Sequence, residues 1–207
     1  MTVVSLEKTS AEHITVHFSD GSEIRSTLGA VTDSLLCCGK ELTGEEYRHF
    51  AASSENFLAL EKGYSLVATR QMSGKELKGK LAKSGCGPEA TEFCVSKLYE
   101  SGYLDDERYA GAVARHYSAR GYGPARLRQE FYKRGIPKEL WEDAIESLPE
   151  DDERIDAILE RRLKDPNDKD EVRKAANYLF RRGYRWDDIR SAIARYSDSY
   201  FPEDDST

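Results

Sequence analysis

The chain has 207 residues, 39% of them hydrophobic and 33% charged, and a formal net charge of −7. Twelve tyrosines, seven phenylalanines and two tryptophans provide apolar surface for a core, so the composition excludes a disordered chain. No run of eighteen apolar residues is present, which excludes a membrane-spanning helix. Glu7 and Lys8 stand where a signal peptide needs an apolar segment, so we expect a cytoplasmic protein.

The first thirty residues have the two-residue periodicity of strands. Apolar and polar side chains alternate over residues 13–18, and the following Asp20-Gly21 pair favours a tight turn into a second strand at residues 23–25. Residues 3–6 are apolar enough for a third strand.

After residue 28 the pattern becomes helical. Thr43 to Glu46 and Ser73 to Glu76 both fit a capping box, in which the hydroxyl and the carboxylate each accept a hydrogen bond from a backbone N–H at the helix start. Proline fits the first helical position and glycine fits helix ends. The prolines are Pro88, Pro124 and Pro137, and the glycines are Gly85, Gly102, Gly121, Gly135 and Gly183. These signals predict about nine helices over residues 55–197.

Three segments repeat the same spacing of residues around a glycine, and these glycines are 50 and 48 residues apart. A large apolar residue stands four positions before each glycine, an acid four positions after it, and an apolar pair nine and ten positions after it. In order, the matched residues are Gly85, Gly135 and Gly183; Leu81, Phe131 and Leu179; Glu89, Glu139 and Asp187; Cys94-Val95, Ala144-Ile145 and Ala192-Ile193. A period near fifty residues with three helices in each unit predicts a tandem helical repeat.

We therefore predict a mainly α protein with three tandem three-helix repeats in an elongated array, preceded by a small N-terminal β-hairpin or three-stranded segment. Residues 1–54 form the strand-bearing segment with short helices, residues 55–101, 105–148 and 151–197 form the repeats, and residues 198–207 form an acidic tail. An array of this kind suits a long, repetitive partner better than a small molecule.

The sequence contains no phosphate-binding loop, dinucleotide fingerprint, zinc-protease motif or nucleophile elbow. The acids Asp105, Asp106 and Glu107 stand at a helix start, where capping explains them better than a metal site. The four cysteines form no CxxC pair, and we expect them to be reduced and mostly buried. We predict no catalytic residue, no metal ligand and no cofactor.

The charge is distributed unevenly along the chain. Residues 1–61 hold ten acids against four Lys and Arg residues, whereas residues 108–134 hold seven Lys and Arg residues with Glu130 as the single acid. A basic block between acidic flanks predicts a directed electrostatic surface rather than general coating of DNA.

Helical geometry places the basic residues on outward faces. In residues 124–134, the inward stripe leaves Arg126 and Lys133 on one flank and Arg128 and Tyr132 on the other. Charge removal on these flanks is expected to leave the fold intact.

The neighbouring helices continue this basic pattern. Arg108 and Arg115, seven residues apart, share an outer helix face, and Lys174 and Arg181 point outward from the third repeat. For any one of these side chains, a solvated helix face is the better explanation. The second helix of every repeat is basic, however, so the set favours an anionic partner, either nucleic acid or an acidic protein surface.

We expect the partner-binding surface to include eleven residues. These are Arg108, Arg115, Arg120, Tyr122, Arg126, Arg128, Tyr132, Lys133, Arg134, Lys174 and Arg181. Among the aromatic residues, Tyr117 is expected in the core, while Tyr122 and Tyr132 are expected to be more open and able to stack on bases.

Several segments resemble the RecX family of bacterial regulatory proteins. GYLDDERYA (102–110) and ARGYGPARLRQEFYKRGI (119–136) look like the hallmark segments of the family, and YLFRRGYRWDDIRSAI (178–193) resembles the end of its third unit. Residues 73–85 are similar to its first unit. The resemblance covers roughly residues 55–197 and is specific in the central repeat.

The resemblance implies a protein without catalytic activity that acts in homologous recombination, DNA repair and the SOS response. Such a protein binds the RecA recombinase, especially its filament on single-stranded DNA, lies in the filament groove and suppresses ATP hydrolysis, strand exchange and repressor cleavage. We expect it to be a monomer. Because some family members bind DNA directly, the alternative is a helical-repeat module that acts on single- or double-stranded DNA itself, although the net acidity of this chain disfavours strong binding of that kind.

Overall fold

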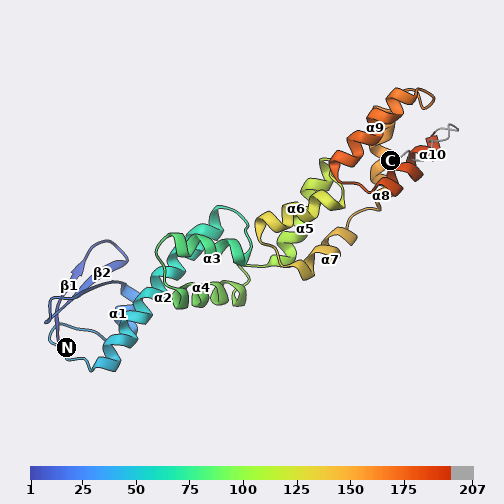
Figure 1. Ribbon diagram of the computed structural model, residues 1–207. Helices are drawn as coiled ribbons and strands as arrows, with labels where there is room; N and C mark the ends of the chain where they lie inside the picture. The colour runs from blue at the N-terminus through green and yellow to red at the C-terminus, as the bar shows by residue number, and fades with distance from the viewer. Residues whose placement is uncertain (197–207) are drawn as a thin grey trace, which may run out of the picture. The chain divides into compact units, whose positions relative to one another are not determined.

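The computed structural model describes residues 1–196, so the expected acidic tail at residues 198–207 lies outside the described residues. The chain divides into two compact units, Met1–Asp105 and the part from Asp106 onward. A small sheet opens the first unit, and helices make up the rest of the described chain (Figure 1). The predicted fold class, helical repeats preceded by a small sheet, is confirmed.

The N-terminal sheet has three antiparallel strands in the order β1-β2-β3: Val3–Lys8, His13–Phe18 and Glu23–Thr27. The tight turn between β2 and β3 lies where the sequence predicted it. Gly21 adopts a φ of +84°, and Asp20 Oδ1 accepts a hydrogen bond from the backbone N–H of Ser22 at 3.0 Å. The three-stranded form of the N-terminal segment is therefore the one observed.

Two helices follow the sheet, α1 (Leu28–Asp33) and α2 (Gly44–Thr69). The predicted capping box starts α2, because Thr43 Oγ1 accepts from the N–H of Glu46 while Glu46 Oε2 accepts from the N–H of Thr43. The sheet core packs on the first half of α2 around Phe50, and the first helical repeat packs on its second half around Ala59. One continuous helix thus crosses the expected division between residues 54 and 55.

Eight further α-helices complete the described part of the chain. They are α3 (Gly74–Lys83), α4 (Pro88–Glu100), α5 (Asp106–Ala119), α6 (Pro124–Arg134), α7 (Trp141–Glu146), α8 (Asp151–Arg162), α9 (Lys169–Arg182) and α10 (Trp186–Tyr196). Pro88 and Pro124 occupy the first helical position as expected. Pro137 instead precedes a 3₁₀ turn, η1 (Lys138–Leu140), which leads into the short α7.

The repeat register shows in the burial of the matched residues. Leu81, Phe131 and Leu179 are fully buried, each in the core of its own repeat. The glycines that follow them adopt positive φ angles of 87°, 65° and 94°, in the region where a Cβ atom is unfavourable. These are the second helices of the repeats, α3, α6 and α9.

Within the second unit, the ends of α6 and α9 are joined by their backbones. The N–H of Gly123 donates to the carbonyl of Arg182 at 2.9 Å, and the N–H of Ala125 donates to the carbonyl of Gly183 at 3.0 Å. A Cβ atom on Gly123 would lie 2.7 Å from the backbone of Gly183, so only glycine permits this approach. The start of α6 and the end of α9, the basic second helices of two repeats, are thereby held together.

Among residues 1–196, no helix is both long and apolar enough to cross a membrane. The same residues contain no group of three or more His, Cys, Asp or Glu side chains placed to hold a metal ion. The expectation of mostly buried cysteines was wrong, since Cys37 and Cys38 are exposed, Cys86 is half-buried and Cys94 alone is buried. Cys37 and Cys38 lie in the connection between α1 and α2. The spacing of the cysteines in the sequence does not reveal this exposed position.

Candidate functional site

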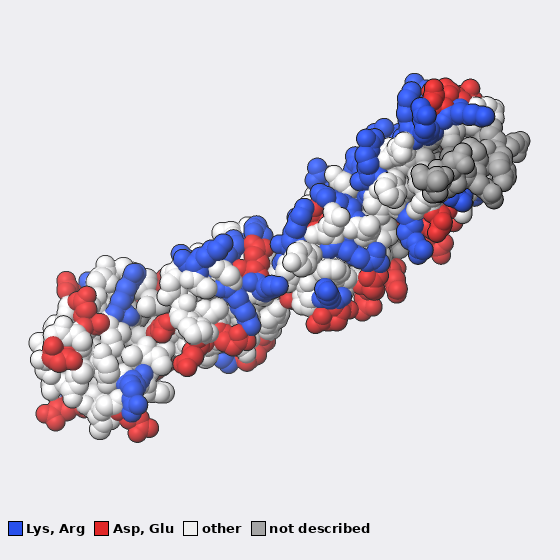
Figure 2. All heavy atoms as spheres, in the orientation of Figure 1, with Lys and Arg blue, Asp and Glu red and all other residues white. Residues whose placement is uncertain are grey.

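Basic side chains gather along two helices of the second unit. On the face that Figure 2 shows, Lys and Arg atoms follow α6 and α9, whereas acidic atoms gather over α7. Lys133 on α6 and both Lys174 and Arg181 on α9 are exposed, as the helical periodicity predicted. We refer to the exposed side chains of α6 and α9 as the basic surface.

The basic surface is organised around one buried acid, Glu130, whose side chain is only 7% exposed. Arg134 Nη1 lies 2.5 Å from Glu130 Oε2, while Arg126 Nη2 and Lys133 Nζ approach Glu130 Oε1 at 3.2 and 3.4 Å. Arg134 also donates to the hydroxyl of Tyr117 at 3.0 Å. Three of the expected site residues therefore meet at a carboxylate that neutralises part of their charge.

Electrostatics keep Glu130 ionised despite its burial. Burial alone raises the pKa of this carboxyl, but hydrogen bonds from Arg134, Tyr117 and Lys133 outweigh that effect and hold the pKa below its usual 4.5. Burial alone lowers the pKa of Arg134, but its hydrogen bonds to Glu130 and Tyr117 outweigh that effect and raise the pKa above its usual value. Charge removal at Arg126 or Lys133 thus also takes a partner from a buried carboxylate, which their outward position alone did not indicate.

Arg128 lies on the opposite flank of α6, as predicted, and pairs with an acid of α7. Its Nε and Nη2 donate to the two carboxylate oxygens of Glu142 at 2.9 and 2.6 Å. This two-pronged hydrogen bonding lowers the pKa of Glu142 and raises that of Arg128. Arg128 therefore fixes α7 against α6 in addition to contributing charge to the surface.

The expected residues of α5 and the loop after it fall into two groups. Arg108 and Arg115 are exposed on α5, apart from the cluster around Glu130. Arg120 lies at the junction of the second and third repeats, where its carbonyl accepts from Arg182 Nη1 at 2.8 Å.

Tyr122 is less open than expected. It is half-buried, and the guanidinium groups of Arg182 and Arg126 lie 4.5 and 5.8 Å from its ring centre. Tyr132, by contrast, is 72% exposed, in agreement with its expected place on the flank of α6. Tyr132 can therefore meet a partner directly, whereas Tyr122 supports the arginines around it.

The sequence reasoning missed Phe180 on α9, which is 58% exposed. Phe180 and Tyr132 both stand three positions before the terminal glycine of their helices, so the repeat alignment already contained the signal. Phe180 packs edge-on against Trp186 with ring centres 6.0 Å apart, which holds the exposed ring in place. Two repeats thus present an exposed aromatic ring beside basic residues at the same position.

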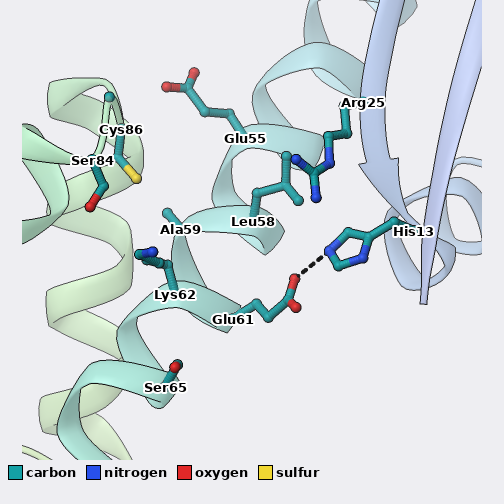
Figure 3. A pocket seen from close by; sticks show the side chains of 11 residues that line it. His13, Arg25, Glu55, Leu58, Ala59, Glu61, Lys62, Ser65, Ser84 and Cys86 are labelled. Carbon is teal, nitrogen blue, oxygen red and sulfur yellow. Dashed lines mark hydrogen bonds and ion pairs between the residues drawn. The ribbon is translucent and has the colours of Figure 1, made fainter. Parts of the chain in front are cut away.

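The first unit contains a hollow of about 500 Å³ between the sheet, α2 and the turn before α4 (Figure 3). Across it, His13 Nε2 lies 2.7 Å from Glu61 Oε2, which ties β2 to α2. Glu55 Oε1 accepts from the N–H of Gly87 at 2.8 Å and ties α2 to the start of α4. These contacts are explained by packing within the unit, and no expected site residue lies among them.

Comparison with known proteins gives a consistent result. Residues 105–145 match the family model for the second three-helix domain of RecX, and residues 150–193 match the model for its third three-helix domain. The regulatory protein RecX of Caldanaerobacter subterraneus subsp. tengcongensis is 30% identical over 193 residues, which cover 92% of this chain and 96% of that protein. The regulatory protein RecX of Xanthomonas axonopodis pv. citri is 35% identical over 136 residues, which cover 64% of this chain and 84% of that protein.

Solved structures show the same fold. A crystal structure of a regulatory protein RecX superposes with a TM-score of 0.71 at 17% identity and covers 93% of this chain and 98% of its own. RecX from Lactobacillus salivarius gives a TM-score of 0.60 at 18% identity, with coverage of 68% and 96%. The relatives are named as regulatory proteins, and the match to the first of them runs over nearly the whole chain. From its repeats, its sequence and its fold, this chain belongs to the RecX family.

Proposed function

We propose that this chain regulates the RecA recombinase by binding RecA and its filament on single-stranded DNA. It inhibits the ATPase, strand-exchange and coprotease activities of the filament and catalyses no reaction itself. The observation that carries this proposal is the match over 193 residues to a named RecX regulatory protein. In this role the chain acts as a cytoplasmic monomer in homologous recombination, DNA repair and the SOS response.

The basic surface supports a protein partner. Tyr132 and Phe180 are exposed aromatic rings with basic neighbours, and aromatic and arginine side chains are the usual anchors of protein interfaces. The two rings occupy equivalent positions of the second and third repeats, so these two repeats offer the same kind of contact. A surface that repeats in this way suits a partner that also repeats, such as a filament of identical subunits.

Direct action on DNA is the second candidate, and the basic second helices favour it. Neutralisation within the surface weakens this candidate, because Glu130 pairs with three cations and Glu142 pairs with Arg128. A protein that binds DNA through phosphates loses affinity steeply as salt rises, whereas the regulator requires RecA to be present. Binding to free single strands at two salt concentrations distinguishes the two functions.

The deciding experiment measures ATP hydrolysis by the cognate RecA on single-stranded DNA with increasing amounts of this protein. The parent chain should lower the rate at or below stoichiometric amounts. The double variant Tyr132→Ala, Phe180→Ala should need about 10-fold more protein for the same inhibition, because exposed aromatic anchors carry much of an interface's binding energy. Both side chains are exposed, so the fold should be preserved.

Phe93→Ala provides the matched control, since Phe93 is an exposed aromatic residue on α4, outside the second helices. This variant should inhibit like the parent. If the parent neither binds the cognate RecA nor changes its ATPase rate, the regulator proposal fails. Equal inhibition by the parent and the double variant would instead show that the aromatic pair is not the contact.

A further inference from the structure

A second hollow, of about 750 Å³, lies within the second unit at the junction of its two repeats. The end of α5, one face of α8 and part of α9 surround it. Its volume is typical of sites for small molecules. Four arginines line it, Arg120, Arg154, Arg161 and Arg162, and none of its described lining residues is an acid.

Two of the lining residues carry buried donors that lack a partner. Tyr184 is only 2% exposed, and its hydroxyl has no hydrogen-bond partner among the described residues. The side chain of Arg154 is 9% exposed, and its Nε is also without a partner within residues 1–196. Buried polar atoms are nearly always hydrogen-bonded, so two unpartnered donors on residues that line one hollow favour a hydrogen-bond-accepting ligand there.

The remaining contacts of Arg154 hold its guanidinium group in position. Nη1 donates to Ser118 Oγ at 3.0 Å, Nη2 pairs with Asp151, and the group lies 5.7 Å from the ring centre of Tyr184. Burial lowers the pKa of Arg154 and raises the pKa of Tyr184. Both directions follow from burial, and a bound anion would favour the charged guanidinium.

We propose that this hollow binds the phosphate group of a phosphate ester, with a nucleotide as the representative ligand. Guanidinium groups match phosphate oxygens in charge and in the geometry of their paired donors, and arginine is the usual residue for such recognition. Tyr184 and Arg154 are the buried members of this lining, and Arg161 is an exposed one. This inference is independent of the proposed regulation of RecA.

The test titrates the full chain, without RecA, in a calorimeter. The probes are inorganic phosphate, adenosine monophosphate and an oligodeoxythymidine that lacks terminal phosphates. Inorganic phosphate and the mononucleotide should bind, and Tyr184→Phe or Arg161→Ala should each weaken binding about 10-fold through loss of one hydrogen bond to a charged group. Arg173→Ala removes an exposed arginine of α9 outside the hollow and should bind like the parent.

Thermal unfolding without ligand separates binding from folding. Tyr184→Phe keeps the buried ring and removes only an unpartnered hydroxyl, so its melting temperature should equal or exceed that of the parent. If only the oligonucleotide binds and both variants weaken it, the phosphate belongs to a nucleic-acid strand and the site stands. If none of the three probes binds the parent at millimolar concentration, or if both variants bind like the parent, the proposal is overturned.

Discussion

At the scale of single residues, the organisation of α6 depends on Glu130. The sequence correctly placed Arg126 and Lys133 on one flank, because the inward positions of Leu127 and Phe131 fix the orientation of the helix. An acid four residues from an arginine usually forms an exposed pair, so the burial of Glu130 was not predictable from spacing. It depends on the packing of α6 against α5.

Glu130→Gln is expected to make stability less dependent on pH. The folded-state pKa of Glu130 lies below its usual 4.5, so its charge stabilises the fold above that value and the contribution disappears as pH falls through the folded pKa. At pH 7 the variant should lose about 1–3 kcal/mol of unfolding free energy, the range for hydrogen bonds to a buried charge. Urea denaturation at neutral and at acidic pH measures the unfolding free energy with Glu130 charged and with Glu130 protonated.

Glu142→Gln is the control for this comparison. Its carboxylate is also paired with an arginine but is 55% exposed, and such pairs contribute about 1 kcal/mol or less. The parent and Glu130→Gln should approach each other in stability once the pH falls below the folded-state pKa of Glu130. If the difference in unfolding free energy between the parent and Glu130→Gln stayed constant across the pH range, the loss would come from the shape of the side chain rather than from its charge.

At the scale of elements, the repeat could be predicted in detail and the connections between its parts could not. Leu81, Phe131 and Leu179 are buried as the alignment requires, because a helix end and its inward residue are local features. The backbone bonds between the ends of α6 and α9 are long-range contacts, and no local pattern announces them. The hollow lined by arginines is surrounded by α5, α8 and α9, which are also distant in sequence, and was missed for the same reason.

Helix boundaries show a similar difference. The capping box marked the start of α2, but Ser53 and Ser54, whose residue type also suits a helix start, lie inside α2, and the helix continues into the first repeat. Pro137 was expected at the first position of a helix, but it precedes a 3₁₀ turn that leads into α7. Local signals therefore predict where a helix begins better than they predict where the chain divides into units.

Gly183→Ala tests the junction against a matched glycine, Gly85→Ala. Both glycines have similar positive φ angles, 94° and 87°, so both substitutions should cost about 1–2 kcal/mol from backbone strain. A Cβ atom on Gly183 would also lie 2.6 Å from the backbone nitrogen of Arg126, whereas nothing lies within 4 Å of a Cβ atom on Gly85. The Gly183 variant should therefore lose about 1–3 kcal/mol more.

Chemical denaturation of the two glycine variants gives the comparison. The difference between them isolates the steric effect, because the strain is common to both. Equal losses would mean that the ends of α6 and α9 separate at little cost. A larger loss for Gly183→Ala would show that the close approach of the two backbones is part of the stable fold.

At the scale of the whole molecule, the chain is divided into two units with separate cores. The clusters around Phe50 and Leu77 lie in the first unit, while those around Phe131 and Leu179 lie in the second. Both tryptophans of the chain, at positions 141 and 186, belong to the second unit. Tryptophan fluorescence therefore reports on the second unit, whereas far-UV circular dichroism reports on helices of both.

Phe131→Ala is expected to separate these two signals during unfolding. Phe131 is fully buried against the ring of Trp141, so its truncation should cost about 3–5 kcal/mol, and the fluorescence midpoint should move to a lower denaturant concentration. The helices of the first unit keep their own core, so part of the dichroism signal should remain to the higher midpoint of the parent. Tyr132→Ala, at the exposed neighbouring position, should change either midpoint by no more than about 0.5 kcal/mol in free energy. If both signals of Phe131→Ala shifted together, the two units would unfold as one cooperative body. If Tyr132→Ala were the more damaging variant, the repeat register would be wrong by one residue.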